Sequence, residues 1–368
     1  MLKRLHLQNF TVFADADFEF GPGLNVLVGN NGTGKSHVLK VGYALFDTIA
    51  NLSKGEVDTF KLEWSKENFR TYLSKNLKGV FQPERDELGK LSRWGTQKVT
   101  SITGEFSLVN QLQMSVVLPF QDSSLQVVQV QSLGEGPKLG EIENPVFIPA
   151  KEVLTLSWIS RLDERYKLPI DTTYLNLLSS LRPLALKKPE EAATELLVKL
   201  EDLIGGTIEQ AGERFYLIPK KGVSIEMNLV AEGIRKFAIL SQLLANGKLN
   251  TSTTLFWDEP EANLNPALLR QLAAILAELA RQGFQIILAT HSMSLLKEFH
   301  ILSRQKDAKP LPIKYFGLNA ELGEATRIVT TDNFEYLPDV VALEVELEQA
   351  DELDGIFAKE DRERHANI

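Results

Sequence analysis

The sequence predicts an α/β fold with a mainly parallel sheet, an antiparallel β subdomain and a helical insertion. An apolar strand at 24–28 runs into a glycine-rich loop and then into apolar residues at helical spacing. A second apolar strand, 254–257, ends in two carboxylates, and a third, 285–290, ends in a polar cluster. Strands that alternate with helices form parallel sheets, whose carboxyl ends hold ligands. We therefore expect one site at these strand ends.

The loop after the first strand fits the pattern G-x-x-x-x-G-K-S/T without a mismatch. Its residues are Gly29, Asn30, Asn31, Gly32, Thr33, Gly34, Lys35 and Ser36. Such a loop directs backbone N–H groups and the positive end of the following helix at a polyphosphate. Lys35 is expected to reach the β- and γ-phosphates and Ser36 to hold Mg²⁺. The sequence thus predicts a nucleoside triphosphate and Mg²⁺ as ligands, and no motif in it selects the base.

The other two strand ends supply further groups that phosphoryl transfer needs. Asp258 is placed to bind Mg²⁺, and Glu259 is placed to polarise the attacking water. His291 can contact the γ-phosphate or that water, and the alternative is a hydrogen-bonded core histidine. Between these strands, Asn265 begins a helix that Gly283 ends.

Together these motifs resemble an ABC-type ATPase head of the RecF, SMC and OLD branch. That branch includes stand-alone AAA-type ATPases of bacterial phage-defence systems. The resemblance rests on the phosphate loop and on residues 258–266 and 289–292, with a similar N-terminal pattern at 5–10 and 18–25. It implies ATP as the nucleotide, ATPase activity, and a homodimer or higher oligomer that closes two Mg²⁺-ATP between protomers.

The same family has a signature helix, which touches the γ-phosphate held by the other subunit. Residues 231–240 match it, and Gly233 permits close backbone approach. Ala231 replaces the serine often found there, and this departure bears on the rate of hydrolysis more than on ATP binding. Arg235 or Lys236 could compensate, or both could lie on a solvated basic face.

Relatives also use a glutamine that senses Mg²⁺ and the attacking water. Gln82 is the candidate, because an apolar segment and Pro83 frame it. The alternative is a simple turn residue.

The middle of the chain, between the phosphate loop and Gly233, has no sustained heptad repeat. Residues 98–131 alternate as antiparallel strands do, and 150–206 have helical spacing. The expected segments are an N-terminal part of the ATPase lobe with the phosphate loop (1–60), a basic segment with an antiparallel β subdomain (61–149), a helical insertion (150–206), a C-terminal part of the ATPase lobe (207–330) and an acidic tail (331–368).

Composition excludes several classes of function. The absence of cysteine excludes disulfides, iron–sulfur clusters and cysteine-ligated zinc. No apolar run reaches membrane-spanning length, and residues 1–7 do not read as a secretory signal, so we expect a cytoplasmic protein without a membrane partner. Residues 331–368 carry the whole formal charge of −9. Within them, 340–350 could form an acidic docking helix or a solvated packing helix.

The leading hypothesis is an ATPase that dimerises around Mg²⁺-ATP and controls a separate effector, a toxin or nuclease, in bacterial defence. We expect the effector to be separate because the metal-dependent (Toprim) nuclease pattern of OLD proteins is not seen after His291. One alternative is a RecF-like DNA repair ATPase, for which the basic segment 61–98 would be a DNA patch rather than a solvated surface. Another is a slowly hydrolysing scaffold that holds a partner.

Overall fold

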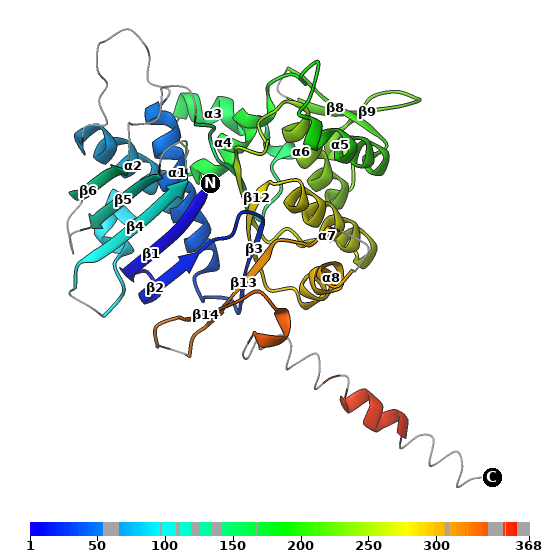
Figure 1. Ribbon diagram of the computed structural model, residues 1–368. Coiled ribbons are helices and arrows are strands. Elements are labelled where there is room, and N and C mark those ends of the chain that lie inside the picture. Colours follow the sequence, from blue (N-terminus) through cyan, green and yellow to red (C-terminus); the bar gives the residue numbers. More distant parts are fainter. Residues whose placement is uncertain are drawn as a thin grey trace.

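A six-stranded sheet forms the centre of the computed structural model (Figure 1). Its strand order is β14-β13-β3-β12-β11-β7, and the neighbours from β13 to β7 pair in parallel. Its strands are β3 (Leu24–Gly29), β7 (Val146–Ile148), β11 (Thr254–Asp258), β12 (Gln285–Thr290), β13 (Ile313–Asn319) and β14 (Arg327–Thr331). Only β14 runs antiparallel to its neighbour within this sheet. The prediction of a mainly parallel sheet is confirmed.

The structure describes most, not all, of the chain. The described residues are 1–53, 66–95, 98–107, 111–118, 126–133, 142–166, 168–212, 214–305, 309–321, 323–337, 349 and 351–358. Residues 351–358 are helical and exposed, whereas the apolar tail positions Val340, Leu343, Leu347 and Ala350 lie outside the described residues. In the described part of the chain, no helix has the length and apolar character needed to cross a bilayer.

An antiparallel sheet joins the N-terminal strands to the middle of the chain. Its order is β2-β1-β4-β5-β6. The strands are β1 (Leu2–Phe10), β2 (Phe13–Glu19), β4 (Thr100–Ser107), β5 (Gln111–Leu118) and β6 (Gln126–Leu133). The antiparallel strands expected within 98–131 are therefore present, and they extend this sheet rather than the parallel one.

Helices cover both faces of the parallel sheet. The described helices are α1 (Lys35–Ser53), α2 (Lys66–Phe81), α3 (Ile159–Tyr166), α4 (Thr172–Leu181), α5 (Glu191–Ile204), α6 (Glu232–Ala245), α7 (Pro266–Arg281) and α8 (Met293–Ser303). Leu27 of β3 packs into a core with α1 and the antiparallel sheet. Its neighbours Val26 and Val28 face the opposite core, which contains α4 to α8. This alternation is expected for a strand buried on both sides.

Helices α4 and α5 lie in the 150–206 segment, and both pack into the same core as β11 and β12. A small antiparallel sheet follows, with β8 (Gly206–Ala211), β9 (Arg214–Pro219) and β10 (Ile225–Glu226) in the order β10-β9-β8. Short 3₁₀ helices complete the described elements, namely η1 (Glu84–Asp86), η2 (Leu88–Leu91), η3 (Leu154–Leu156), η4 (Met227–Leu229) and η5 (Phe334–Tyr336).

Candidate nucleotide site

The glycine-rich loop lies between the end of β3 and the start of α1, as its sequence predicts. It contains Gly29, Asn30, Asn31, Gly32, Thr33, Gly34, Lys35 and Ser36. The segment 30–32 is exposed, whereas Thr33 and Lys35 are buried. Gly34 has a φ of +91°, and a Cβ there would lie 2.5 Å from Cγ2 of Val12. Only glycine fits this position, because it combines positive φ with a close contact.

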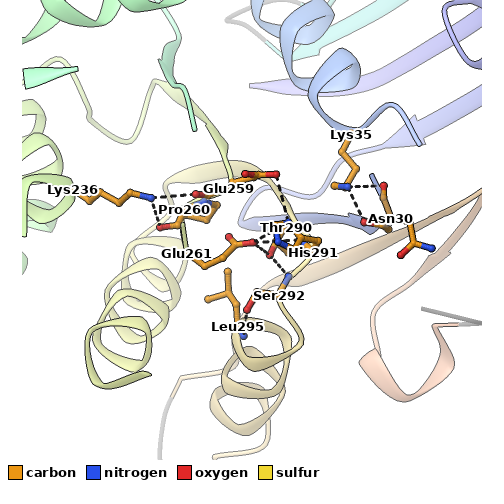
Figure 2. Close-up of polar contacts among 11 residues, drawn as sticks. Asn30, Lys35, Lys236, Glu259, Pro260, Glu261, Thr290, His291, Ser292 and Leu295 are labelled. Carbon is orange, nitrogen blue, oxygen red and sulfur yellow. Dashed lines mark hydrogen bonds and ion pairs between the residues drawn. The ribbon is translucent and has the colours of Figure 1, made fainter. Parts of the chain in front are cut away.

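Lys35 points back onto its own loop. Its Nζ donates to the carbonyl oxygens of Gly29 at 2.7 Å and Asn30 at 2.9 Å (Figure 2). Burial lowers the pKa of Lys35, and the carboxylate of Glu259 is the main opposing influence. The loop thus holds a buried cation beside exposed backbone amides, which is a suitable environment for a polyphosphate.

Asp258 and Ser36 meet at the carboxyl end of β11. The side chains of Ser36 and Asp258 are hydrogen-bonded. Burial raises the pKa of Asp258, and this hydrogen bond opposes the shift. Among the described residues, buried Oδ1 of Asp258 finds no hydrogen-bond partner. Two oxygen side chains with a spare carboxylate oxygen fit Mg²⁺, which binds oxygen and usually takes only one or two protein carboxylates.

Glu259 and His291 face each other across neighbouring strand ends. Nδ1 of His291 lies 3.5 Å from Oε1 of Glu259. Glu259 has a φ of +46°, and its N–H donates to the carbonyl of Ala289 at 2.9 Å. The His291 side chain is 51% exposed, so it is not the core histidine considered as the alternative. The two polar groups are thus close together and accessible from solvent.

Glu261 has a place in the site that the sequence did not reveal. Its side chain is 7% exposed, and Oε1 accepts from the Thr290 hydroxyl at 2.5 Å and the His291 N–H at 3.3 Å (Figure 2). Oε2 is buried without a hydrogen-bond partner in the described part of the chain. A third acid next to Asp258 and Glu259 was the available signal, but only the fold brings it to Thr290.

The signature-like helix α6 begins where the sequence predicts. Ala231 is its N-cap residue and makes no side-chain cap hydrogen bond. Gly233 is buried, and a Cβ there would lie 3.0 Å from Leu268 Cδ1. Asn263 Nδ2 donates to Glu232 Oε1 at 2.8 Å, which fastens the start of α6 to the loop before α7.

A solvated basic face on α6 was one expectation, and the structure corrects it. Lys236 is 3% exposed, and its Nζ donates to the carbonyl oxygens of Glu259 at 3.3 Å and Pro260 at 3.1 Å. The side chain of Arg235 is 13% exposed and lies 3.5 Å from the Glu152 carboxylate. Both side chains are largely buried, because polar groups of other segments lie close enough to contact them.

Gln82 lies on an exposed turn directly after α2, with a φ of +47°. The preceding Phe81 packs its ring 5.7 Å from that of His37, in the first turn of α1. The turn is therefore close to the helix that follows the phosphate loop. Within the described ranges, no contact places the Gln82 side chain against the other predicted residues, so its sensing role stays a prediction.

Two protein-family models match most of the chain. One, described as "AAA domain, putative AbiEii toxin, Type IV TA system", matches residues 142–297. The other, described as "AAA domain", matches residues 4–135. The first contains the α6, β11 and β12 side of the site, and the second contains the phosphate loop.

Characterised relatives match a smaller part. The DNA replication and repair protein RecF of Clostridium botulinum is 34% identical over 76 residues, which are 20% of this chain and 20% of RecF. RecF of Streptococcus uberis is 38% identical over 69 residues, covering 19% and 18%. The match thus spans about a fifth of the length of these relatives.

Two solved structures of SMC heads are similar to this chain. A structure of an Smc head bound to the C-terminal winged-helix domain of ScpA has a TM-score of 0.51 and 14% identity, covering 91% of this chain and 98% of the other. The SMC head domain from Thermotoga maritima gives a TM-score of 0.45 and 15% identity, with 90% and 98% covered. The former shows that this chain has the fold of an SMC-type P-loop ATPase head.

Proposed function

We propose that this chain, an ATPase head of the AAA/ABC type related to SMC and RecF proteins, hydrolyses ATP and thereby controls a separate effector in the cytoplasm. The observation that carries the proposal is the meeting of the phosphate loop with Asp258 and with the Glu259–His291 pair at one edge of the parallel sheet. Phosphoryl transfer needs charge neutralisation and a positioned nucleophile, and these residues can supply both.

Each group has a distinct task in this proposal. The loop amides and Lys35 bind the phosphates, while Ser36 and Asp258 would hold Mg²⁺, which neutralises developing charge on the phosphate oxygens. Glu259 orients and polarises the attacking water. His291, half exposed and 3.5 Å from Glu259, contacts that water or the γ-phosphate.

A second copy of the chain completes the site in our proposal. In Figure 2, Lys236 of α6 and Lys35 lie on opposite sides of the Glu259–His291 pair. The start of α6 at Ala231 is exposed, and helix N-termini favour phosphate. A partner's α6 could therefore approach the phosphate bound at Lys35, so that two Mg²⁺-ATP are closed between two protomers.

The effector is proposed to be a toxin or nuclease that acts in anti-phage defence. This finer role is supported by the toxin-type description of the family model over residues 142–297. A RecF-like repair ATPase is the second candidate, favoured by the RecF matches. It predicts DNA-stimulated hydrolysis with a salt-dependent affinity, carried by exposed bases such as Lys75 and Lys90.

A slowly hydrolysing scaffold is the third candidate. It is favoured by the uncapped Ala231 at the start of α6, where a serine hydroxyl could bind phosphate. Such a protein would stay closed around ATP and hold its partner until triggered.

The test is the native mass of Glu259→Gln protein, with and without Mg²⁺-ATP, after purification from its own host. The amide removes the charge that activates water and keeps the shape, so ATP is expected to accumulate and the mass to double. Glu195→Gln, at a carboxylate on α5 whose side chain is 78% exposed, is the matched control and should hydrolyse ATP like the unaltered chain. A Glu259→Gln mass that does not change when ATP binds would reject the ATP-gated dimer.

Steady-state phosphate release separates the remaining candidates. Turnover that rises with double-stranded DNA and falls with salt would favour the RecF-like role. Bound ATP without measurable turnover in the unaltered chain would favour the scaffold.

A further inference from the structure

We propose that Lys236 is a positioning residue that transmits the placement of α6 to the backbone of Glu259. This inference rests on the proposed function, because it assigns a regulator to the residue that activates water. The contact in question is buried within one chain. It lies outside both the phosphate loop and the N-terminal end of α6.

The backbone of Glu259 needs such a support. Its φ of +46° is in the left-handed region, which is unfavourable for a residue with a Cβ. Its N–H is held by Ala289 of β12. Its carbonyl oxygen accepts from the Ala262 N–H at 3.1 Å and from Lys236 Nζ at 3.3 Å. The N–H and the carbonyl of Glu259 are thus both hydrogen-bonded. Of these hydrogen bonds, the one from Lys236 comes from α6.

The free-energy cost of burying Lys236 indicates that this side chain does more than fill space in the core. It is 3% exposed, and the hydrogen bonds of its ammonium to the described residues go to backbone carbonyls. Burial lowers its pKa, with Glu261 as the main opposing charge. A buried cation that faces neutral carbonyls is less stable than an apolar side chain of the same volume would be. What the lysine contributes is backbone geometry, because its single ammonium donates to the carbonyls of both Glu259 and Pro260 and holds them together.

The neighbouring residue of α6, Arg235, contacts a different part of the chain, the start of the 150–206 segment. Arg235 approaches Glu152, whose carboxylate also accepts hydrogen bonds from Leu154 and Thr155 at η3. Adjacent residues of α6 therefore contact the start of the 150–206 segment and the Glu259 turn. A shift of α6, whether from a second protomer at Ala231 or from a partner on this segment, would move the Glu259 carbonyl.

The experiment replaces Lys236 by Met, which is unbranched and of similar length but has no donor. The expected kcat falls by about tenfold to a hundredfold, because a small misplacement of a reacting group costs that much, while KM changes less than about twofold. Lys199→Met is the control, since that lysine lies on the surface of α5 with its side chain 56% exposed. Hydrogen exchange of the Glu259, Glu261 and Ala262 amides should become faster in Lys236→Met and stay unchanged in the control.

The exchange measurement does not depend on turnover. Unchanged exchange at 259–262 in folded Lys236→Met would overturn the inference, whatever the activity. If the unaltered chain lacks ATPase activity, the proposed function fails while the exchange result still decides whether Lys236 supports Glu259. Should Lys236→Met not fold, Lys236→Arg takes its place. Because its donors point in different directions, a split between kcat and KM is again expected, and an unaltered kcat with unaltered exchange counts against the proposal.

Discussion

The Thr290 hydroxyl, at the end of β12, donates a hydrogen bond to the Glu261 carboxylate in the turn that follows β11, with an oxygen–oxygen distance of 2.5 Å. Both residues are buried. Thr290 immediately precedes His291, and Glu261 follows Glu259 by two residues. This hydrogen bond therefore fixes the spacing between the two segments that carry the polar pair of the candidate site.

Replacing Thr290 by Val tests the strength of this link. The change keeps the shape of the side chain but removes the hydroxyl that donates to Glu261 and accepts from the Ser292 N–H at 2.9 Å. Among the described residues, the Glu261 carboxylate then keeps the His291 N–H as its donor. Loss of a hydrogen bond to a buried charged group costs about 1.5–3 kcal/mol, so the free energy of unfolding should fall by at least that amount. Urea unfolding measures it, with Thr330→Val on exposed β14 as a control that should change little. Equal effects of the two substitutions would contradict this account.

Two glycines of the phosphate loop are expected to respond differently to Ala. At Gly34 the added Cβ would lie 2.5 Å from Val12 and 2.7 Å from Phe13, with φ at +91°. At Gly32, φ is +84° but nothing lies within 4 Å of the added Cβ. Gly32→Ala should therefore cost only the backbone strain, about 1–2 kcal/mol. Gly34→Ala should cost clearly more, and unfolding without nucleotide measures both. A smaller loss for Gly34→Ala would show that the loop relaxes.

Local pattern predicted the parts of the molecule that depend on neighbours in sequence. The strand before Gly29, the helix from Asn265 and the start of α6 at Ala231 each follow from apolar spacing and a cap or glycine signal. The pairing of β1 with β4 did not follow, because it joins residues about a hundred positions apart with no local turn to mark it.

The burial of individual polar side chains could not be predicted from the sequence either. Lys236 follows Arg235 on a helix, and two adjacent bases usually indicate a solvated face. Only the fold places backbone carbonyls of the Glu259 turn beside Lys236 and a carboxylate beside Arg235. The same holds for Glu261, whose partner Thr290 comes from another strand.

The N-cap of α7 gives a prediction that is independent of nucleotide. The Asn265 side chain accepts from the Leu268 N–H at 2.9 Å. Asn265→Ala removes this acceptor and should reduce the free energy of unfolding by about 1 kcal/mol, a typical cost for losing an N-cap. Asn265→Asp keeps an acceptor and should lose much less. Chemical denaturation distinguishes them, and an equally large loss in both variants would assign the effect to another contact.

Ala231→Ser should strengthen the start of α6. Ala231 has extended ψ of 138° and no cap hydrogen bond, so a serine hydroxyl can accept from an N–H of the first turn. The free energy of unfolding should rise by about 0.5–1 kcal/mol. In the proposed dimer the same hydroxyl also adds a donor at the partner's phosphate, so kcat should rise as well. Ala231→Gly, which restores neither acceptor nor donor, separates the two effects. Greater stability with unchanged kcat would mean that the start of α6 caps its own helix but does not reach the reacting phosphate.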